Sequence, residues 1–514
     1  MSLVLSQAFE SPVEAVFAAD LLALRPELRY RDALPGARAA VLDRLWRGLS
    51  LDPLPRVAHR DRDTITLDGG RLLARSGAVI SLDGKHFDHP AALLAALGWP
   101  ETACLETEVA HSVAAMALAR AGAPALGRPA ETLAEHEQSV VDGHPLHPCC
   151  RNRTGFTAAD HLAYGPEFRP IVALDLLAVP ADRCVVRGDW PEDLRDGDSV
   201  LLPIHPWQSA HVLPRHDLTP QRPGALPSRP LLALRTLAPI GKPWQVKTAL
   251  STQLTSAVRD ISGGSVDTSV ALSAFLGDAV RRLDGLSLQH NRAAAAVLID
   301  GEPHRDLAAI VRDSPAVLPG ETVLPIAALT ARPVSGACPP LCSLAADPAE
   351  WLAEFASVAL PPLLTLLAWG VALEAHEQNL VLVLENGRPK RLIYRDLADI
   401  RLGPRRLSAA GLSWPGMPDR FRVADEDLRA KLFATFFANT TTGLVTTLAD
   451  HAPGLWSVVA DQIRRAYDAM PDTAATSADR SALLTEPIPA KPLTLMRLDP
   501  NTSAWAYLPN PFAS

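Results

Sequence analysis

The chain has 514 residues, of which 48% are hydrophobic and 21% charged, so it can bury a large core and should divide into two or three packed subdomains. A formal net charge of −8 argues against coating nucleic acid or an anionic membrane, because the field of the whole protein repels polyanions. Any phosphate group must therefore be held by local positive charge.

The first region, residues 1–130, alternates helix-like and short strand-like segments. Met1 is not followed by a basic segment and an apolar signal core, and the six cysteines of the chain are too few and too irregularly spaced for a disulfide framework. We therefore expect a cytoplasmic protein. The expected helices cover 11–28, 33–49, 90–99 and 107–122, and the expected strands cover 64–67 and 78–82.

The second region, residues 131–345, is expected to mix helices with strands at 171–179, 199–204 and 231–237. Its first motif is GHPLHPCCRNRTGF, residues 143–156, where two His-Pro pairs favour extended backbone.

This loop presents cationic and imidazole side chains, and it is a candidate anion cradle. One alternative is a zinc site, which is disfavoured because its two cysteines are adjacent. Another is a loop held by buried histidines. We expect the cysteines to be packing residues. The side chains concerned are His144, His147, Cys149, Cys150, Arg151 and Arg153.

The segment KTALSTQLTSAVRDIS, residues 247–262, carries polar side chains at every fourth position: Lys247, Ser251, Thr255 and Arg259. This spacing keeps them on one side of either a helix or a strand. Only six of the 49 basic residues are lysines, and a compact ammonium group suits a phosphate. We interpret the segment as a phosphate-binding strip, with an exposed polar helix face as the alternative. The motifs LLPIHPWQ (201–208) and LRTL, which contains Arg235, are expected to edge the same pocket.

The third region, residues 346–514, begins with an apolar stretch at 355–373. Its two prolines and its polar residues favour a buried core helix over a membrane span. Further helix is expected at 428–450.

Between these helices, Asn386-Gly387 separates two apolar runs. This pair predicts a hairpin with a type I′ turn, because both turn positions need positive φ. Regular pairing from Glu385 and Arg388 places Gln378 opposite Arg395, and Glu377 opposite Asp396.

Polar side chains gather at the open end of this hairpin. Oxygen atoms of Glu374, Asn379 and Asp396 would suit Mg²⁺, and His376 and Arg395 could stabilise a transferring phosphoryl group or an attacking carboxylate. The alternative is a solvated strand end with an Arg395–Asp396 ion pair. The chain has no Walker A, Rossmann, GxSxG or CxxC motif, so a common glycine loop does not bind phosphate here.

Taken in order, these motifs resemble the IucA/IucC family of siderophore synthetases, which join carboxylates such as citrate to amines without a peptide synthetase. The resemblance covers about residues 135–510. It rests on HPLHPCCRNRTGF, YGPEFRP (164–170), LLPIHPWQ, LRTL, KTALSTQLTSAVRDIS, RDLAAIVRDSP (305–315), HEQN (376–379), RD (395–396) and KPLTLMRL (491–498).

The resemblance implies a mixed α/β (α+β) fold shaped like a cupped hand, with ATP in a central cleft. The thumb would be residues 1–130, the fingers 131–345 and the palm 346–514. The implied substrates are a carboxylic acid, citrate or a related di- or tricarboxylic acid, and an amine, hydroxylamine or alcohol. Neither nucleic acid nor a membrane is an implied partner, and a homodimer is one expectation for the assembly.

The resemblance also implies roles for individual residues. ATP would be bound by His147, Arg153, Arg235, Lys247, Ser251, Thr255 and Arg259, and Mg²⁺ by Glu374, Asn379 and Asp396. His376 and Arg259 would stabilise the adenylation transition state. The substrates would contact His376, Gln378, Arg395, Lys491 and Arg497.

Two positions depart from the family pattern: Arg151 replaces a usual lysine, and Ala233 replaces a frequent serine. Two other functions compete with the ligase. A small-molecule phosphotransferase would use the His376–Asp396 cluster, but the spacing of a kinase catalytic loop is missing. A non-enzymatic protein that binds or reduces iron or a siderophore would need cysteines near the C-terminus, and the last cysteine is Cys342.

Overall fold

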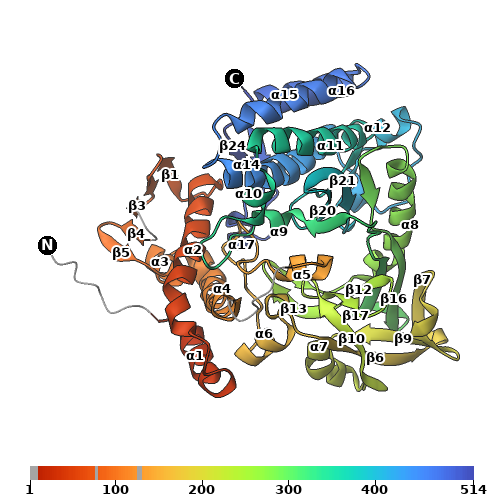
Figure 1. Cartoon of the computed structure of the whole chain (residues 1–514). Helices are drawn as coiled ribbons and strands as arrows, with labels where there is room; N and C mark the ends of the chain where they lie inside the picture. The colour runs from red at the N-terminus through yellow and green to blue at the C-terminus, as the bar shows by residue number, and fades with distance from the viewer. Residues whose placement is uncertain (1–9, 76–78, 124–129, 514) are drawn as a thin grey trace.

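The computed structural model describes residues 10–75, 79–123 and 130–513, and it mixes helices and sheets along the chain (Figure 1). The expected mixed α+β class is confirmed. Strand pairing crosses the boundary at residue 345, because β15 and β18 precede it and join the hairpin that follows it. The division into three regions stays a prediction.

The N-terminal region packs helices onto a five-stranded antiparallel sheet, at the left of Figure 1. A capping box starts the first helix: Ser11 accepts from the backbone of Glu14, and Glu14 accepts from the backbone of Ser11. The expected helices and strands are found within a few residues of their predicted limits. The helices are α1 Pro12–Leu24, α2 Tyr30–Leu51, α3 Pro90–Leu97 and α4 Ala103–Gly122, and the strands in spatial order are β1 Val57–Arg60, β2 Thr64–Leu67, β3 Gly70–Arg75, β4 Val79–Leu82 and β5 Lys85–Phe87.

A nine-stranded sheet forms the second region, and α8 (Gly263–Val280) packs on it. The spatial order is β7 Cys184–Gly188, β16 Asn291–Ile299, β17 Glu302–Asp313, β12 Trp244–Thr248, β11 Thr236–Pro239, β10 Arg222–Pro230, β6 Val172–Pro180, β9 Ser199–Ile204 and β8 Arg195–Asp196. Smaller elements around it are α5 Leu133–Gln138, α6 Ala158–Tyr164, α7 Pro206–His211, the 3-10 helix η6 Leu213–His216, β13 Leu250–Leu254 and β14 Ala257–Arg259.

The strand expected at 231–237 is wrong for most of its length. Residues 231–235 form the tight connection between the antiparallel strands β10 and β11. Leu234 has φ 63° there, and its N–H donates to the carbonyl of Leu231. The apolar residues of this segment therefore form a buried turn. Hydrophobicity alone does not distinguish a buried turn from a buried strand.

The third region is built on a four-stranded sheet in the order β15 Leu286–Leu288, β21 Arg388–Tyr394, β20 Leu380–Glu385 and β18 Glu321–Pro325. The predicted turn is confirmed, with φ 53° at Asn386 and 78° at Gly387. The remaining elements are α9 Ile326–Thr330, α10 Pro340–Leu344, α11 Pro348–Ala368, β19 Val371–Ala372, β22 Arg401–Leu402, α12 Pro404–Ala409, α13 Asp425–Leu432, the π-helix η8 Phe433–Thr441, α14 Thr442–Leu448, α15 Leu455–Asp468, α16 Ala474–Thr485, β23 Ile488–Ala490, α17 Leu495–Leu498 and β24 Ala506–Leu508.

Helix α11 is the apolar stretch of the sequence, and it begins and ends a few residues earlier than expected. By length and composition it is the one helix of the described residues that could cross a membrane. Its apolar side chains, among them Phe355, Leu363 and Leu367, are fully buried in the largest hydrophobic cluster. This burial agrees with the expected core helix.

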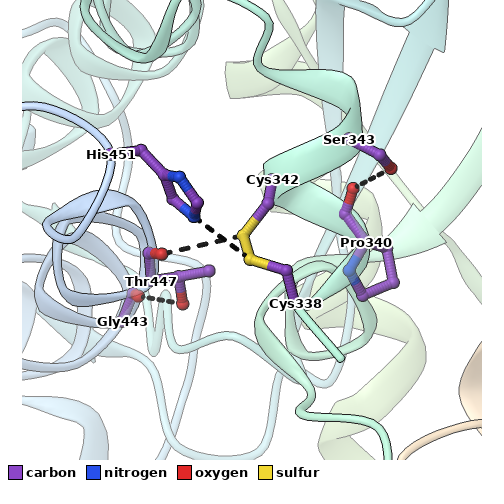
Figure 2. Close-up of a disulfide and its surroundings, with 7 residues drawn as sticks. All are labelled: Cys338, Pro340, Cys342, Ser343, Gly443, Thr447 and His451. Atoms are coloured by element: carbon purple, nitrogen blue, oxygen red, sulfur yellow. Dashed lines mark hydrogen bonds between the residues drawn. A yellow bond between two sulfur atoms is a disulfide. The ribbon is translucent and has the colours of Figure 1, made fainter. Parts of the chain in front are cut away.

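A disulfide joins Cys338 to Cys342 beside the start of α10 (Figure 2). Nε2 of His451 lies 3.2 Å from Sγ of Cys338, and the carbonyl oxygen of Thr447 lies 3.8 Å from Sγ of Cys342. The sequence does not predict this local bridge next to α14.

The C-terminal segment returns to the N-terminal region. The carboxylate of Asp52, at the end of α2, accepts from the backbone N–H groups of Thr494 (2.7 Å) and Leu495 (3.0 Å). Leu495 also enters the hydrophobic cluster of α2 and α4. Residues 491–498 therefore bring the two ends of the chain together next to the candidate site.

Candidate active site

The phenol of Tyr394, at the end of β21, holds the backbone around two predicted metal ligands. Its hydroxyl accepts from the N–H of Glu374 (3.1 Å) and donates to the carbonyl of Asp396 (3.2 Å). Asp396 has φ 66°, a conformation that costs about 1–3 kcal/mol for a non-glycine residue and is common at functional sites. The surrounding fold therefore holds Asp396 in place despite the unfavourable conformation of its backbone.

Asp396 forms an ion pair with Lys247 of β12. Both carboxylate oxygens lie 2.9 Å from Nζ of Lys247. Burial alone would raise the pKa of Asp396, but the charge and hydrogen bonds of Lys247, with the charges of Arg312 and Arg235, hold this pKa well below its ordinary value. Burial lowers the pKa of Lys247 to about 8 against the opposing effect of Asp396. The carboxylate is thus ionised and surrounded by cations.

Lys247, Arg312 and Asp396 line a pocket between β12, β17 and α8. Three hydroxyl-bearing residues of α8, Ser265, Thr268 and Ser269, also line it. Hydroxyls and cations around one cavity suit an anionic ligand.

A second lysine cluster surrounds Glu374. Its Oε1 accepts from Lys491 (2.6 Å) and Lys431 (2.9 Å), and its other oxygen lies 3.8 Å from Nε2 of His376. Lys431 also pairs with Asp399. Burial acts to raise the pKa of Glu374, but the charges of Lys491, His376 and Lys431 bring it well below the ordinary value. Predicted site residues Glu374, His376 and Lys491 are therefore brought together.

The π-helix η8 fixes the chain that carries these groups. Oγ1 of Thr435 accepts from the N–H of Ala375 (3.1 Å), and Oγ1 of Thr440 donates to its carbonyl (2.9 Å). Oδ1 of Asn439 accepts from the N–H of Glu377 (3.3 Å). Two threonines of the π-helix thus hold both the N–H and the carbonyl of Ala375, the residue between Glu374 and His376. π-Helices are frequent at functional sites.

The pairing expected at the hairpin mouth is wrong by one residue. Leu384 pairs with Pro389 but Val383 pairs with Arg391, so Lys390 forms a β-bulge in β21. Beyond this bulge the backbone N–H of Arg395 donates to Asn379, not to Gln378. Pro389, next to the extra residue, is a local signal that was overlooked, because proline inside a strand is largely confined to edges and bulges.

Arg395 is directed away from the lysine clusters. Its guanidinium donates to Glu137 (2.6 Å) and to the carbonyl of Gln378, and both ion-pair partners are buried. The alternative Arg395–Asp396 ion pair is not formed, and a substrate-binding role for Arg395 would require this buried pair to open. The side chain of Gln378 is partly exposed next to it.

The phosphate-binding strip is not one element. Lys247 lies on β12, Ser251 on β13 and Arg259 on β14, while Thr255 occupies the turn between the last two strands with φ 59°. The argument from a four-residue spacing is therefore wrong, because the hairpin turn interrupts it.

Individual members of the strip differ in their surroundings. Ser251 donates to Asp306 (2.7 Å) and accepts from Gln208. The guanidinium of Arg235 donates to the carbonyls of Arg259 (2.6 Å) and Asp260, and burial lowers its pKa to about 10. The strip therefore supplies Lys247 and Arg259 to one basic cluster, which Arg235 of the LRTL motif joins, and it supplies Ser251 to a separate polar network.

The loop at 143–156 places one histidine, His147, near the basic cluster. Nδ1 of His147 accepts from the N–H of Cys149 (2.9 Å), and its buried Nε2 has no partner among the described residues. Burial, with the charges of Arg497 and Arg259, lowers the pKa of His147 to about 3. A neutral imidazole with a free nitrogen thus lies near the basic cluster.

The two arginines of this loop share one buried ion-pair partner. Arg151 and Arg153 both donate to the buried carboxylate of Glu167, at 3.0 and 2.8 Å. Arg153 is engaged in this ion pair, and its expected contact with ATP stays a prediction. The adjacent cysteines are buried, and they belong to neither group of potential metal ligands in the described residues.

Arg497 is another predicted substrate residue that is paired within the protein. Its guanidinium donates to both carboxylate oxygens of Glu108 on α4 and to the carbonyl of Ser256. It joins α17 to α4 and the β13–β14 turn.

Sequence reasoning missed three charged residues of the site: Arg312, Lys431 and Asp399. Arg312 lies in a motif that was recognised but given no role, and Lys431 is one of the six lysines. Asp399 follows Asp396 by three residues. The rarity of lysine was the usable signal, because three of the six lysines, Lys247, Lys431 and Lys491, meet carboxylates here.

The comparisons with known proteins divide the chain in two. Residues 132–331 match the family model described as IucA / IucC family. Residues 349–504 match a model described as ferric iron reductase FhuF-like transporter. The resemblance to the IucA / IucC family expected from the sequence is confirmed.

Curated relatives include staphyloferrin A synthase of Staphylococcus aureus, 25% identical over 53% of this chain and 53% of that protein. Aerobactin synthase of Escherichia coli is 26% identical over 52% of this chain and 56% of its own length. The chain thus spans about half the length of these relatives.

Among solved structures, the petrobactin biosynthesis protein AsbB of Bacillus anthracis aligns with a TM-score of 0.78 at 20% identity, covering 94% of this chain and 96% of that one. ATP-bound aerobactin synthetase IucA of Klebsiella pneumoniae aligns with a TM-score of 0.75 at 19% identity, covering 93% and 99%. The IucA / IucC segment and the FhuF-like segment therefore sit within a shared fold.

Proposed function

We propose that the chain is an ATP-dependent, AMP-forming ligase of siderophore biosynthesis. It activates citrate or a related di- or tricarboxylic acid as an acyl-adenylate and joins it to an amine, hydroxylamine or alcohol. The observation that carries the proposal is the Lys247–Asp396 pair, with Arg235 and Arg312 around it, at a hydroxyl-lined pocket. Relatives named as siderophore synthases support the reaction class.

The first step needs positive charge more than a nucleophile. A substrate carboxylate oxygen attacks the α-phosphorus of ATP, the bond to the bridging oxygen breaks, and pyrophosphate leaves. Negative charge gathers on the phosphoryl oxygens, which Lys247, Arg235 and Arg259 are placed to stabilise. The unpartnered Nε2 of His147 can donate a hydrogen bond to the same group.

In the second step the amine nitrogen attacks the acyl carbon, the amide bond forms, AMP leaves, and the amine loses a proton to solvent. Lys431, Lys491 and His376 surround Glu374 and offer positive charge to a polycarboxylate. This cluster is our candidate for the acid-binding part of the site.

The residues present fit Mg²⁺. Asp396 and Glu374 offer carboxylate oxygens, and Nδ2 of Asn379 donates to the carbonyl of Glu374 (3.1 Å), which leaves its Oδ1 as an acceptor. Bound Mg²⁺ would neutralise phosphate charge. Lys247 would then exchange its carboxylate partner for a phosphate oxygen.

The iron-reducing alternative has less support. Residues 349–504 match the FhuF-like model but contain no cysteine, so that stretch has no thiolate for an iron–sulfur cluster. We place the ligase in the cytoplasm, and the homodimer stays a prediction.

Product analysis tests the proposal directly. The protein is incubated with ATP, Mg²⁺, citrate and a panel of diamines and hydroxylamines, and nucleotides and products are measured by mass spectrometry. We expect AMP and pyrophosphate in equal amounts with an amide or ester product. ADP with a phosphorylated acid would support the phosphotransferase instead.

A further inference from the structure

A second polar cluster lies outside the basic site, where β17 meets η6. His304 and Asp306 are two residues apart on β17. His216, the last residue of η6, packs its ring edge-on against His304, with centroids 4.5 Å apart. One ring nitrogen of each histidine and one oxygen of Asp306 lie within 4.8 Å of one another.

A strand irregularity aims these side chains. Ala296 pairs with Ala308, but Leu298 pairs with Pro303, so β17 holds extra residues between the two pairs. Two backbone carbonyls of this irregular stretch accept hydrogen bonds from outside the β16–β17 pair. The side chain of Gln208 donates to the carbonyl of Asp306, and the N–H of Ile261 donates to that of Arg305. Bulges of this kind redirect side chains and are frequent near functional sites.

The carboxylate is also oriented by a neighbour. Oγ of Ser251 donates to Oδ1 of Asp306 (2.7 Å), and Ser251 is itself held by Gln208. Hydrogen bonds that fix a ligating carboxylate are typical of metal sites. All three side chains are only partly buried, so a cation can reach them from solvent.

We propose that His216, His304 and Asp306 bind one divalent transition-metal cation. Two imidazoles and one carboxylate are a ligand set for Zn²⁺ or Fe²⁺ in which further coordination positions stay open for water or a substrate atom. The set differs from the oxygen-only donors offered to Mg²⁺ by Glu374, Asn379 and Asp396. The proposal does not depend on the ligase function.

Titration with Co²⁺ tests the site, because its d–d absorption reports nitrogen and oxygen ligands. ATP and reductant are left out, so that the Cys338–Cys342 disulfide persists and its sulfurs do not ligate. We expect one Co²⁺ per chain, displaced by Zn²⁺. His304→Gln and Asp306→Asn should each weaken binding at least tenfold, and the asparagine keeps an acceptor for Ser251.

Matched controls separate this site from others. His86→Ala removes an exposed histidine of β5, and Asp396→Asn alters the candidate Mg²⁺ site; both should bind Co²⁺ as the unaltered protein does. In the unaltered protein, Co²⁺ should broaden the NMR signals of two histidines before the others, a readout that does not depend on a variant folding. Absence of Co²⁺ binding, or equal affinity in all variants, would overturn the proposal.

Discussion

Lys247 is a cation kept in a partly buried position by one carboxylate. Its side chain is 14% exposed and its main partner is Asp396. A phosphate that displaced Asp396 would meet an ammonium group already desolvated and oriented, which strengthens an electrostatic contact.

We predict that Lys247→Ala lowers kcat/KM for ATP by about 100- to 1000-fold, as loss of roughly 3–4 kcal/mol of transition-state stabilisation implies. Steady-state release of pyrophosphate measures this effect. Lys85→Ala, which removes an exposed lysine of β5, is the matched control. Unchanged turnover in the Lys247 variant would remove this residue from the site.

For Asp396→Asn we predict that the fold survives while the adenylation rate falls by about two orders of magnitude. The amide keeps the size of the side chain but loses the charge that faces Lys247 and, in our proposal, Mg²⁺. The rate is measured over a Mg²⁺ titration, with Asp182→Asn as an exposed carboxylate control. A normal rate with a normal Mg²⁺ requirement would show that the metal assignment is wrong.

At the scale of elements, turns were more predictable than registers. Asn386-Gly387 was recognised as a type I′ turn, and the same rule applies to Asp83-Gly84 and Asp300-Gly301, which adopt positive φ at both positions and were overlooked. Local dipeptide chemistry determines such turns.

Bulges and reversals depend on distant contacts and were missed. The bulge at Lys390 shifted the hairpin mouth, and the turn at Thr255 divided the strip. The rarity of lysine drew attention to Lys247, which the structure pairs with Asp396. Three arginines expected to contact ligands, Arg153, Arg395 and Arg497, are paired with buried glutamates of other elements, and their ligand contacts stay predictions.

The π-helix supplies a prediction of its own. Thr440→Val removes the donor to the buried carbonyl of Ala375 and should lower the free energy of unfolding by about 1–3 kcal/mol. Because this peptide joins Glu374 to His376, kcat should also fall at temperatures where the protein stays folded. Urea unfolding and initial rates measure the two effects. Thr446→Val, at an exposed position of α14, should change neither. Loss of stability with an unchanged kcat would limit η8 to a structural role.

At the scale of the molecule, Asp52 links the two ends of the chain at an electrostatic cost. Burial raises the pKa of Asp52 to about 6, although two backbone N–H groups oppose the shift. Below pH 3.8 this carboxyl is protonated in both the folded and the unfolded chain. As the pH rises to about 6, the unfolded chain ionises first, so the contribution of Asp52 to stability is lost.

We therefore predict that Asp52→Asn gains stability relative to the unaltered protein between pH 4 and pH 7, by up to about 3 kcal/mol. The amide oxygen can still accept from Thr494 or Leu495. Urea unfolding at both pH values measures the difference, and Asp43→Asn, exposed on the same helix, corrects for general effects of pH. A parallel pH dependence of the two variants would contradict the raised pKa.

The return of residues 491–498 to the N-terminal region also affects how the protein is made. Helices α2 and α4 leave the ribosome long before Leu495, and at about 5–20 residues per second the delay is on the order of tens of seconds. During that time the hydrophobic core of the nascent N-terminal region lacks Leu495, and Asp52 lacks its two backbone hydrogen-bond donors. We expect chaperones that recognise exposed apolar surface to bind this region until residues 491–498 have been made.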